Sequence, residues 1–369
     1  MELTIAKDIL IDYLNIVCRS VSSRTTLPIL ECVLLVAELD GFTLAANDLE
    51  MSIETKKVGA EITKPGNVAL DAKVFSDIVR KMPGDFVRIK TDKNNFTECS
   101  SGRAVLNISG LPGEEFPAAP SLERTGVYTL KSKLLKEMIR QTIFSVATDN
   151  TKPVLTGELF QYVDGSLRLV AVDGFRISYR QTALEGECEP TKAIIPAKAL
   201  TELSRILPTD GDDDVNIYFS DKRAVFEIPG FTFMSRLLEG EFIRYDQIYN
   251  EDFSTIVTTE REPFLAGLER ACLIAGVSKK PPVKLEIKDD SIIITSNTEI
   301  GNSYDEITCD IDGQDLEIAF NPRYLIEALR VIEEEKVVLR LTTPLSPCIL
   351  RGVESEEFKY LILPLKLRS

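Results

Sequence analysis

The fold is decided by a stretch that occurs three times along the chain: "ALDAKVFSDIVRKM" (residues 69–82), "IIPAKALTELSRIL" (194–207) and "IAFNPRYLIEALRVI" (318–332). Each copy joins a strand-like apolar run to an amphipathic helix with two basic residues seven positions apart. Because seven residues make two helical turns, the two basic side chains share one face. The basic pairs recur every 125 residues: Lys73 with Arg80, Lys198 with Arg205, and Arg323 with Arg330.

The apolar residues of these helices predict the face that is buried. In the first copy they recur at the spacing of a helical stripe, opposite the basic pair. They are Val74, Phe75, Ile78 and Val79. We therefore expect each helix to pack this stripe against a sheet.

Other features recur in the same order. A second helix type begins each unit, with an offset of 125 residues to the second copy and 129 to the third. Its matched positions are Leu10, Leu135 and Phe264, then Leu14, Ile139 and Leu268, followed by the prolines Pro28, Pro153 and Pro282. The chain is thus three copies of a unit of about 125 residues, and a repeat of this length is a whole domain.

This repeat predicts the fold class and the domain boundaries. Two helices and several alternating strands per unit indicate an α+β fold, in which the helices pack on antiparallel sheets. The predicted domains are residues 1–125, 126–250 and 251–369.

One hairpin in the repeat carries unusual side chains. "VAVDGFRISYR" (170–180) reads as strand, Asp-Gly turn and strand, and Asp173 lies 125 residues after Asp48. The turn displays Phe175 and Arg176 side by side. Three interpretations are open: a plain hairpin tip, a catalytic Asp173 with its arginine, or the rim of a docking site.

Composition excludes several function classes. The chain has no His and seven cysteines, none in a C-x-x-C pair. Structural zinc, a disulfide framework and Ser-His or Cys-His catalysis are therefore not expected, and we predict neither metal nor cofactor. Because the chain has no apolar run of membrane-spanning length and no signal-peptide pattern at its start, we expect a cytoplasmic protein without membrane contact.

The charge is unevenly distributed. The net charge is −15, but the spans expected to be helical carry +4, which leaves −19 for the remainder. Solvated amphipathic helices commonly carry Lys and Arg, so any one helix is explained without a ligand. If all the helices face one central space, that space is mildly positive. Such a surface is too weak to hold DNA by affinity, but it suffices for a ring that cannot fall off and remains free to slide.

Several stretches together resemble the β subunit of bacterial DNA polymerase III, the sliding-clamp family. The resemblance covers essentially the whole chain, in order and with matching spacing. The stretches are "RTTLPIL" (24–30), "NDLEM" (47–51), "LPGEEFP" (111–117), "AVDGFR" (171–176), "FNPRYL" (320–325) and "YLILPLKL" (360–367). It implies three clamp domains per chain and a head-to-tail homodimeric ring with twelve helices lining the hole.

The resemblance also implies contacts with DNA and between subunits. Arg24, Lys73, Arg80, Lys198 and Arg205 match inward-facing basic positions that touch phosphates without reading sequence. Lys133, Lys136 and Arg140 share a helical face and join them on that ground. The implied dimer contact sets Leu106 and Ile108 against Leu273 and Ile274 of the other chain. Ordinary core packing is the alternative for these four.

The hairpin acquires a role from the resemblance. In this family the equivalent turn borders a hydrophobic pocket into which partner proteins insert a short peptide. The implied pocket residues are Lys152, Leu155, Val172, Gly174, Phe175, Arg176, Ile177, Ile243, Ile248, Asn321, Tyr324, Leu345, Pro347, Leu361, Ile362, Leu363, Pro364 and Leu365. The chain departs from the family at Phe175, where His is common, at Val172, where Thr is common, and at Lys152 and Lys366, where Arg is usual. The pocket is therefore expected to be more apolar.

The implied function is that of a processivity factor in DNA replication. The implied partners are duplex DNA, the polymerase III alpha subunit, the clamp-loader delta subunit, other polymerases and mismatch-repair proteins. An enzyme is the main alternative, with Asp48 and Glu50, Asp173 and Arg176, or the acidic runs 210–214 and 333–335 around a metal. A scaffold or paralogue that does not bind DNA is the second alternative.

Overall fold

The computed structural model describes residues 1–22, 25–117, 126–184, 188–209, 211–248, 252–275 and 282–366. The chain forms two compact units. Unit 1 consists of Met1–Lys133 and Glu202–Leu237, and unit 2 of Leu134–Thr201 and Leu238–Ser369.

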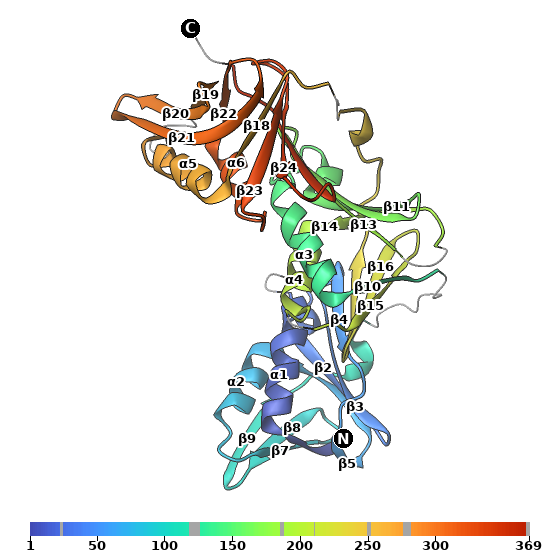
Figure 1. Ribbon diagram of the computed structural model, residues 1–369. Coiled ribbons are helices and arrows are strands. Elements are labelled where there is room, and N and C mark those ends of the chain that lie inside the picture. Colours follow the sequence, from blue (N-terminus) through green and yellow to red (C-terminus); the bar gives the residue numbers. More distant parts are fainter. Residues whose placement is uncertain are drawn as a thin grey trace. The chain divides into compact units, whose positions relative to one another are not determined.

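Each of the three repeats divides again into two modules, and each module is a strand, a helix and three strands (Figure 1). The first repeat contains β1 (Glu2–Ala6), α1 (Lys7–Val17), β2 (Cys32–Glu38), β3 (Gly41–Asn47) and β4 (Met51–Thr55), then β6 (Gly66–Asp71), α2 (Ala72–Lys81), β7 (Phe86–Thr91), β8 (Phe96–Ser101) and β9 (Ala104–Ser109). The short β5 (Glu61–Lys64) lies between these two modules.

The second and third repeats follow the same order. The second contains β10 (Tyr128–Lys131), α3 (Ser132–Thr142), β11 (Gly157–Val163), β12 (Ser166–Val172) and β13 (Arg176–Ala183), then β14 (Thr191–Pro196), α4 (Ala197–Ile206), β15 (Asp214–Phe219), β16 (Arg223–Ile228) and β17 (Phe231–Arg236). The third contains β18 (Thr255–Glu260), α5 (Arg261–Ala275), β19 (Val283–Lys288), β20 (Ser291–Thr298) and β21 (Gly301–Gly313), then β22 (Leu316–Phe320), α6 (Pro322–Leu329), β23 (Lys336–Leu341), β24 (Cys348–Gly352) and β25 (Phe358–Ile362).

The strands of unit 1 form two antiparallel sheets. One has the order β5-β1-β7-β8-β9, and the other β10-β15-β16-β17-β4-β3-β2-β6. In the second sheet β17 of the middle repeat pairs with β4 of the first, and Phe233 lies opposite Ile53. Backbone hydrogen bonds thus join two repeats into one sheet.

Unit 2 uses the same device. Its strands follow the order β14-β11-β12-β13-β25-β24-β23-β18-β21-β20-β19-β22, in which β25 of the last repeat pairs with β13 of the middle one. The strands of the middle repeat are therefore shared between the two units. The two units and the three domains divide the chain differently, and the boundaries 1–125, 126–250 and 251–369 stay a prediction.

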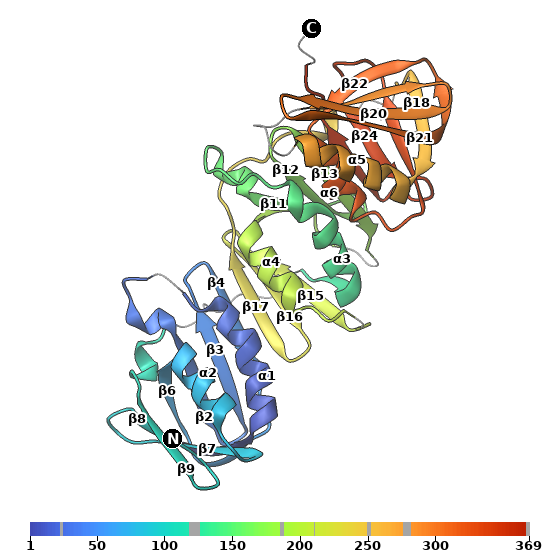
Figure 2. The same ribbon diagram turned by 90° about the vertical axis from the view of Figure 1, so that its left-hand side faces the viewer.

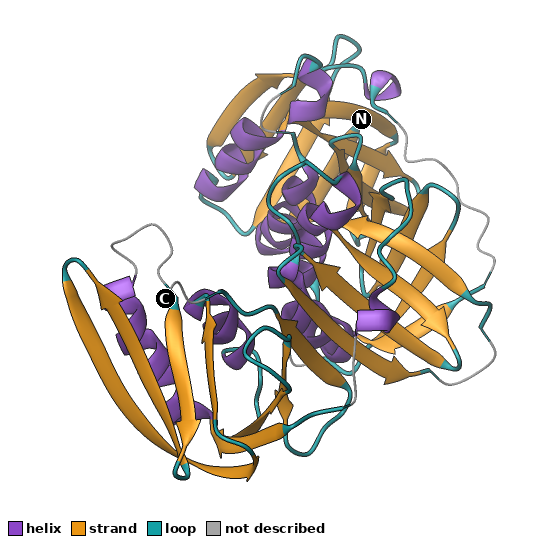
Figure 3. Cartoon of the chain, turned by 90° about the horizontal axis from the view of Figure 1, so that it is seen from above, coloured by secondary structure: helices purple, strands orange, loops and turns teal. Residues whose placement is uncertain are grey.

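The helices pack on sheet faces, as the amphipathic pattern predicts. Helices α1 and α2 contact each other and strands β2, β3 and β6, and they run side by side in Figure 2. In unit 2, α5 contacts α6 and strands β19 to β21, and the helices drawn in purple in Figure 3 lie against the strands. In α2 the side chains of Phe75, Ile78 and Val79 are buried, but Val74 is exposed. The expectation that Val74 belongs to the buried stripe was wrong.

The repeated proline has the same structural role in the first two repeats but a different one in the third. Pro28 and Pro153 each begin a 3-10 turn, four residues before β2 and β11 respectively. Pro282 instead stands directly before β19. Strands β20, β21 and β22 nevertheless begin 125 residues after β12, β13 and β14, because the residues inserted before α5 are offset by a shorter connection after it. Among the described residues, no helix is long and apolar enough to cross a membrane.

Candidate functional site

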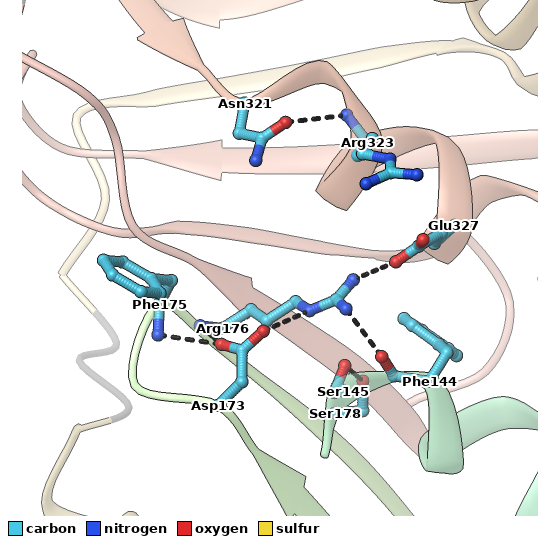
Figure 4. A network of polar contacts seen from close by, with 9 residues as sticks. All are labelled: Phe144, Ser145, Asp173, Phe175, Arg176, Ser178, Asn321, Arg323 and Glu327. Carbon is cyan, nitrogen blue, oxygen red and sulfur yellow. Dashed lines mark hydrogen bonds and ion pairs between the residues drawn. The ribbon is translucent and has the colours of Figure 1, made fainter. Parts of the chain in front are cut away.

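The hairpin between β12 and β13 is held by the carboxylate of Asp173. Its Oδ1 accepts hydrogen bonds from the backbone N–H of Phe175 (2.9 Å) and of Arg176 (3.1 Å) (Figure 4). Gly174 has a φ of +90°, a conformation that residues with a Cβ adopt at a cost. These contacts fix the turn and leave the Phe175 ring 55% exposed.

The guanidinium of Arg176 joins three parts of unit 2: the hairpin turn, helix α6 and the short 3-10 turn that contains Phe144. Its Nε donates to Asp173 Oδ2 (3.0 Å), one terminal nitrogen donates to Glu327 on α6, and the other to the carbonyl oxygen of Phe144 (2.6 Å) (Figure 4). Its plane also lies over the rings of Tyr324 (4.5 Å to the centroid) and Phe144 (5.3 Å). Arg176 is only 9% exposed. Because these contacts engage both Asp173 and Arg176, the pair serves the structure of the turn, and the catalytic interpretation loses its basis.

Behind the turn lies an apolar cluster. Leu155, Val172, Ile177 and Leu361 are buried in it, and Ile243 packs against it. These five residues, from separate parts of the predicted pocket set, are therefore brought together. The cluster also contains residues that the sequence did not point to: Leu159, Val170, Tyr179, Ile194 and Tyr245.

Exposed apolar side chains surround the same turn. The Phe175 ring stacks on Tyr324, with centroids 6.4 Å apart and planes 22° apart. The chain after β25 passes alongside, because Leu363 N donates to Phe175 O (2.9 Å) and Leu365 N donates to Ala319 O (2.7 Å). The side chain of Leu363 is exposed. Leu345, which lies in the connection between β23 and β24, is exposed as well. An apolar wall with an exposed rim suits a short peptide with apolar side chains.

The remaining predicted pocket residues occupy different surroundings. Ile362 points to the other side of β25 from Leu361, into the core of the third repeat, because successive strand side chains alternate. Asn321 caps α6 by accepting a hydrogen bond from Arg323 N (3.2 Å). Lys152 is exposed, Pro347 and Pro364 are half-buried, and the side chain of Ile248 lies outside the described residues.

Seven of the eight basic residues assigned to DNA contact are on helices α2, α3 and α4. Lys73, Lys133 and Lys198 are exposed in the first turns of α2, α3 and α4, and Lys136 is half-buried. Arg24 lies outside the described residues.

Three arginines of the same set have acidic partners. Arg205 pairs with Glu202 (2.5 Å), Arg140 with Glu333 (2.6 Å), and Arg80 with Asp77 (3.5 Å). Glu202 also pairs with Arg19 (3.2 Å). These exposed pairs exchange easily because surface ion pairs contribute little free energy.

The four residues assigned to subunit contact differ in exposure. Leu106 on β9 is exposed and Leu273 at the end of α5 is 73% exposed, whereas Ile108 is buried and Ile274 half-buried. Ile108 thus matches the core alternative within this chain.

A hollow of about 580 Å³ lies elsewhere in unit 2, away from the predicted pocket. It is lined by residues of β18, α5 and β21, among them Thr258, Arg270, Asp305 and Asp310. Within the described ranges, no three acidic or cysteine side chains are gathered in a way that could hold a metal ion.

One buried acid has no counterpart in the sequence predictions. Glu158 on β11 is fully buried, its Oε1 is hydrogen bonded to Thr142 Oγ1, and its Oε2 has no partner. Burial raises the pKa of Glu158 to about 8, although the Thr142 hydrogen bond acts in the opposite direction. The single hydroxyl proton of Thr142 is also directed at Met138 O (2.7 Å), so a protonated Glu158 satisfies the contact best.

Comparison with known proteins agrees with this architecture. Models of the N-terminal, central and C-terminal domains of the DNA polymerase III beta subunit match residues 1–120, 129–243 and 247–366. Three clamp domains joined by strand pairing define the class, and the chain belongs to the DNA polymerase III beta subunit family of sliding clamps.

Individual relatives match over their whole length. The beta sliding clamp of Halalkalibacterium halodurans is 34% identical over 379 residues, covering 99% of this chain and 100% of the relative. The crystal structure of a DNA polymerase III beta subunit from Eubacterium rectale has 40% identity and a TM-score of 0.95, and that of the Bacillus subtilis sliding clamp has 34% and 0.96. Both cover the two chains completely.

Proposed function

We propose that two copies of this chain close head to tail into a ring around duplex DNA, where the ring slides and tethers the replicative polymerase. The ring has no catalytic activity of its own. Partners dock short apolar peptides at the surface around Phe175: the polymerase III alpha subunit, the clamp-loader delta subunit, other polymerases and mismatch-repair proteins.

The observation that carries the ring is a pair of matching strand edges. The second and third repeats each end in a strand that pairs with a strand of the preceding repeat, β17 with β4 and β25 with β13. By their place in the modules, β9 corresponds to β17 and β25, and β21 corresponds to β4 and β13. Among the described strands, β9 pairs only with β8, and residues 301–308 of β21 pair only with β20. A second copy supplies the missing partner for each edge.

The register of this contact follows from the two pairings within the chain. The pair Phe233–Ile53 is equivalent to the pair Tyr360–Ser178, because β17 and β25 begin at residues 231 and 358. The matching positions are Leu106 on β9, which begins at residue 104, and Ser303 on β21, which begins 125 residues after β13. Leu106 is therefore placed opposite Ser303 of the other copy. Val105 then stands opposite Tyr304, which is 65% exposed, and Arg103 opposite Glu306. The exposed Leu273 and Ile300 lie on the same repeat as β21, and apolar and oppositely charged pairs favour association.

Cysteine cross-linking tests the ring and its register. Val105→Cys with Tyr304→Cys should form a disulfide-linked species under mild oxidation, because directly opposite residues have the required Cβ separation. Val105→Cys with Asn302→Cys is the matched control, displaced by two residues along the same face. A monomeric solution mass, or equal cross-linking of both pairs, would contradict this arrangement.

A separate experiment tests DNA contact. Lys73, Arg80, Lys198 and Arg205 are changed together to Glu, and loaded clamps are followed in a processive synthesis assay. We expect shorter products with the ring intact, because like charges repel the phosphates. Unchanged product length would favour the scaffold that does not bind DNA.

The docking surface is tested at its exposed rim. Leu363→Asp should abolish binding of a fluorescein-labelled peptide with leucine and phenylalanine side chains, because a carboxylate then stands in the apolar wall. Leu39→Asp, at a highly exposed leucine of unit 1, is the control. Equal affinity in both variants would refute the site.

A further inference from the structure

We propose that Glu327 on α6 is a positioning residue of the peptide site, which fixes Phe175 and Tyr324 at the rim by holding Arg176. The inference rests on the proposed peptide-docking function and concerns how its geometry is set. No peptide contact by Glu327 itself is involved.

The repeat provides an internal control. Glu327 lies 125 residues after Glu202 and 250 after Asp77, and each of these acids precedes a basic residue by three positions. In the first two copies the acid pairs with that arginine one turn along its own helix, Asp77 with Arg80 and Glu202 with Arg205.

The third copy breaks this pattern. Arg330 pairs instead with Glu269 on α5 (2.7 Å), and Glu327 turns to Arg176 in the preceding repeat. The position of Arg176 is occupied by Met51 in the first copy. Glu202, the counterpart of Glu327, therefore has no arginine at that position to pair with.

A series of contacts links Glu327 through Arg176 to the rim residues Tyr324 and Phe175. Glu327 and Asp173 accept from different nitrogens of one guanidinium, and the Phe144 carbonyl takes a third hydrogen bond (Figure 4). A planar guanidinium held at three points has a fixed orientation. Its face lies against the Tyr324 ring, and Tyr324 in turn stacks on Phe175.

Removal of Glu327 leaves this arrangement with one support fewer. Arg176 keeps Asp173, so the turn remains, but the guanidinium gains freedom to tilt away from α6 and from the Tyr324 ring. We expect Phe175 and Tyr324 to sample more than one arrangement, and a peptide must then select the productive one.

A tryptophan reporter tests positioning without any peptide. The chain contains no Trp, so Phe175→Trp in the full-length protein gives a single emission signal from the rim. Adding Glu327→Ala should shift and broaden that emission. Glu269→Ala on α5, which removes the acidic partner of Arg330 at the C-terminal end of α6, should leave the emission unchanged.

Peptide affinity provides the second measurement. With the labelled leucine–phenylalanine peptide, Glu327→Ala should weaken binding at least about fivefold, the lower limit of typical coupling between sites, while dimer mass is retained. Glu327→Gln keeps one hydrogen-bond acceptor without the charge, so its peptide affinity should lie between those of the unmodified protein and Glu327→Ala. In an Arg176→Ala background, Glu327→Ala should have no further effect, because Glu327 acts through that arginine.

The outcomes separate this inference from the function on which it rests. Unchanged emission and affinity in Glu327→Ala would overturn the positioning role and leave the peptide site intact. Absence of peptide binding by the unmodified protein would refute the peptide site, and the tryptophan emission would still decide whether Glu327 positions the rim. Equal effects of Glu269→Ala and Glu327→Ala would also overturn the inference, since they would indicate general loosening of α6.

Discussion

The hairpin turns at residues 48–51 and 173–176 have the same backbone scheme and different side chains. In each, an aspartate Oδ1 accepts from the N–H groups two and three residues later. In each, the carbonyl of the third residue accepts from the next repeat: Glu50 O from Arg236 N (2.7 Å), and Phe175 O from Leu363 N (2.9 Å).

The difference lies in three side chains. Leu49, Glu50 and Met51 of the first turn correspond to Gly174, Phe175 and Arg176 of the second. The first set places an exposed Leu49 and Glu50 over a buried methionine, with Glu50 near Arg236 (3.7 Å). The second gives an exposed aromatic ring over a guanidinium. The shared backbone therefore makes the junction between repeats, and the side chains decide whether that junction also presents an exposed aromatic ring.

Exchanging the residue beneath the turn should have the largest effect. Arg176→Met leaves Glu327 and Asp173 without their cation. Met51→Arg buries a charge at a position where Asp48 corresponds to Asp173, but Glu202, the counterpart of Glu327, already pairs with Arg19 and Arg205. Breaking a buried ion pair costs about 3–5 kcal/mol, and we expect losses of this order in urea unfolding for both variants. Little change in either would mean that the two turns are interchangeable.

A second contrast between repeats concerns Glu158, whose equivalents are Val33 and Val283, both fully buried. The folded state keeps Glu158 protonated up to about pH 8, whereas the unfolded chain loses that proton near pH 4.5. Stability from this group is therefore greatest below pH 4.5 and declines as pH rises to about 8, by up to ~1.4 kcal/mol per pH unit.

Glu158→Val should remove this dependence. We expect the free energy of unfolding of the variant, measured with urea at fixed ionic strength, to increase relative to that of the unmodified chain from pH 5 to pH 8. Above pH 8 the difference should become constant. Val33→Ala, which changes the matched position of the first repeat without adding a titrating group, should leave the pH dependence as it is. Parallel curves for the unmodified chain and Glu158→Val would show that Glu158 is ionised in the folded protein.

The tip residue tests the docking role directly. Phe175→Glu gives the second turn the glutamate that the first turn has at Glu50. It should lower the affinity for the labelled peptide at least about tenfold, because an apolar contact is replaced by a carboxylate. Glu50→Phe should not create a second binding site, since the matching apolar cluster of the first repeat is smaller: three described residues, Cys32, Ala69 and Phe116, are buried in it, against nine behind Phe175. A binding stoichiometry of two peptides per chain would refute this expectation.

The smallest effect is expected at the position that turns the chain. Leu49 holds a φ of +72°, which strains a residue with a Cβ, whereas Gly174 adopts +90° without that strain. Leu49→Gly should stabilise by about 0.5 kcal/mol after the greater flexibility of glycine in the unfolded chain is counted, and Gly174→Ala should destabilise by about 1 kcal/mol. Thermal unfolding of the two variants measures both signs.

Much of this architecture was accessible from the sequence. The triple repeat predicted two helices per domain, antiparallel sheets and the Asp-Gly hairpin, because periodicity and turn chemistry act locally. The division of each repeat into two modules was missed. Its signal was present in an Ala-Lys pair at the start of both helices: Ala6 stands directly before α1, which begins at Lys7, and Ala72 and Lys73 are the first two residues of α2.

The partners of charged residues were not accessible in the same way. Nothing local distinguishes Glu327 from Glu202, yet one reaches Arg176 and the other Arg19 and Arg205. The burial of Glu158 was equally hidden, because an acid in a strand of a two-layer domain normally faces water. Ion pairs and buried acids depend on which elements meet in space, and the sequence orders the elements without placing them.

The pairing of β17 with β4 has a consequence for synthesis on the ribosome. At about 5–20 residues per second, the interval between completion of β4 at Thr55 and of β17 at Arg236 is roughly 10–35 s. During that time the outer edge of β4 is available to any other strand, including the same edge of a neighbouring nascent chain. Nascent chains on one polysome therefore expose unpaired strand edges that can associate with one another, and wider spacing between ribosomes should favour correct folding.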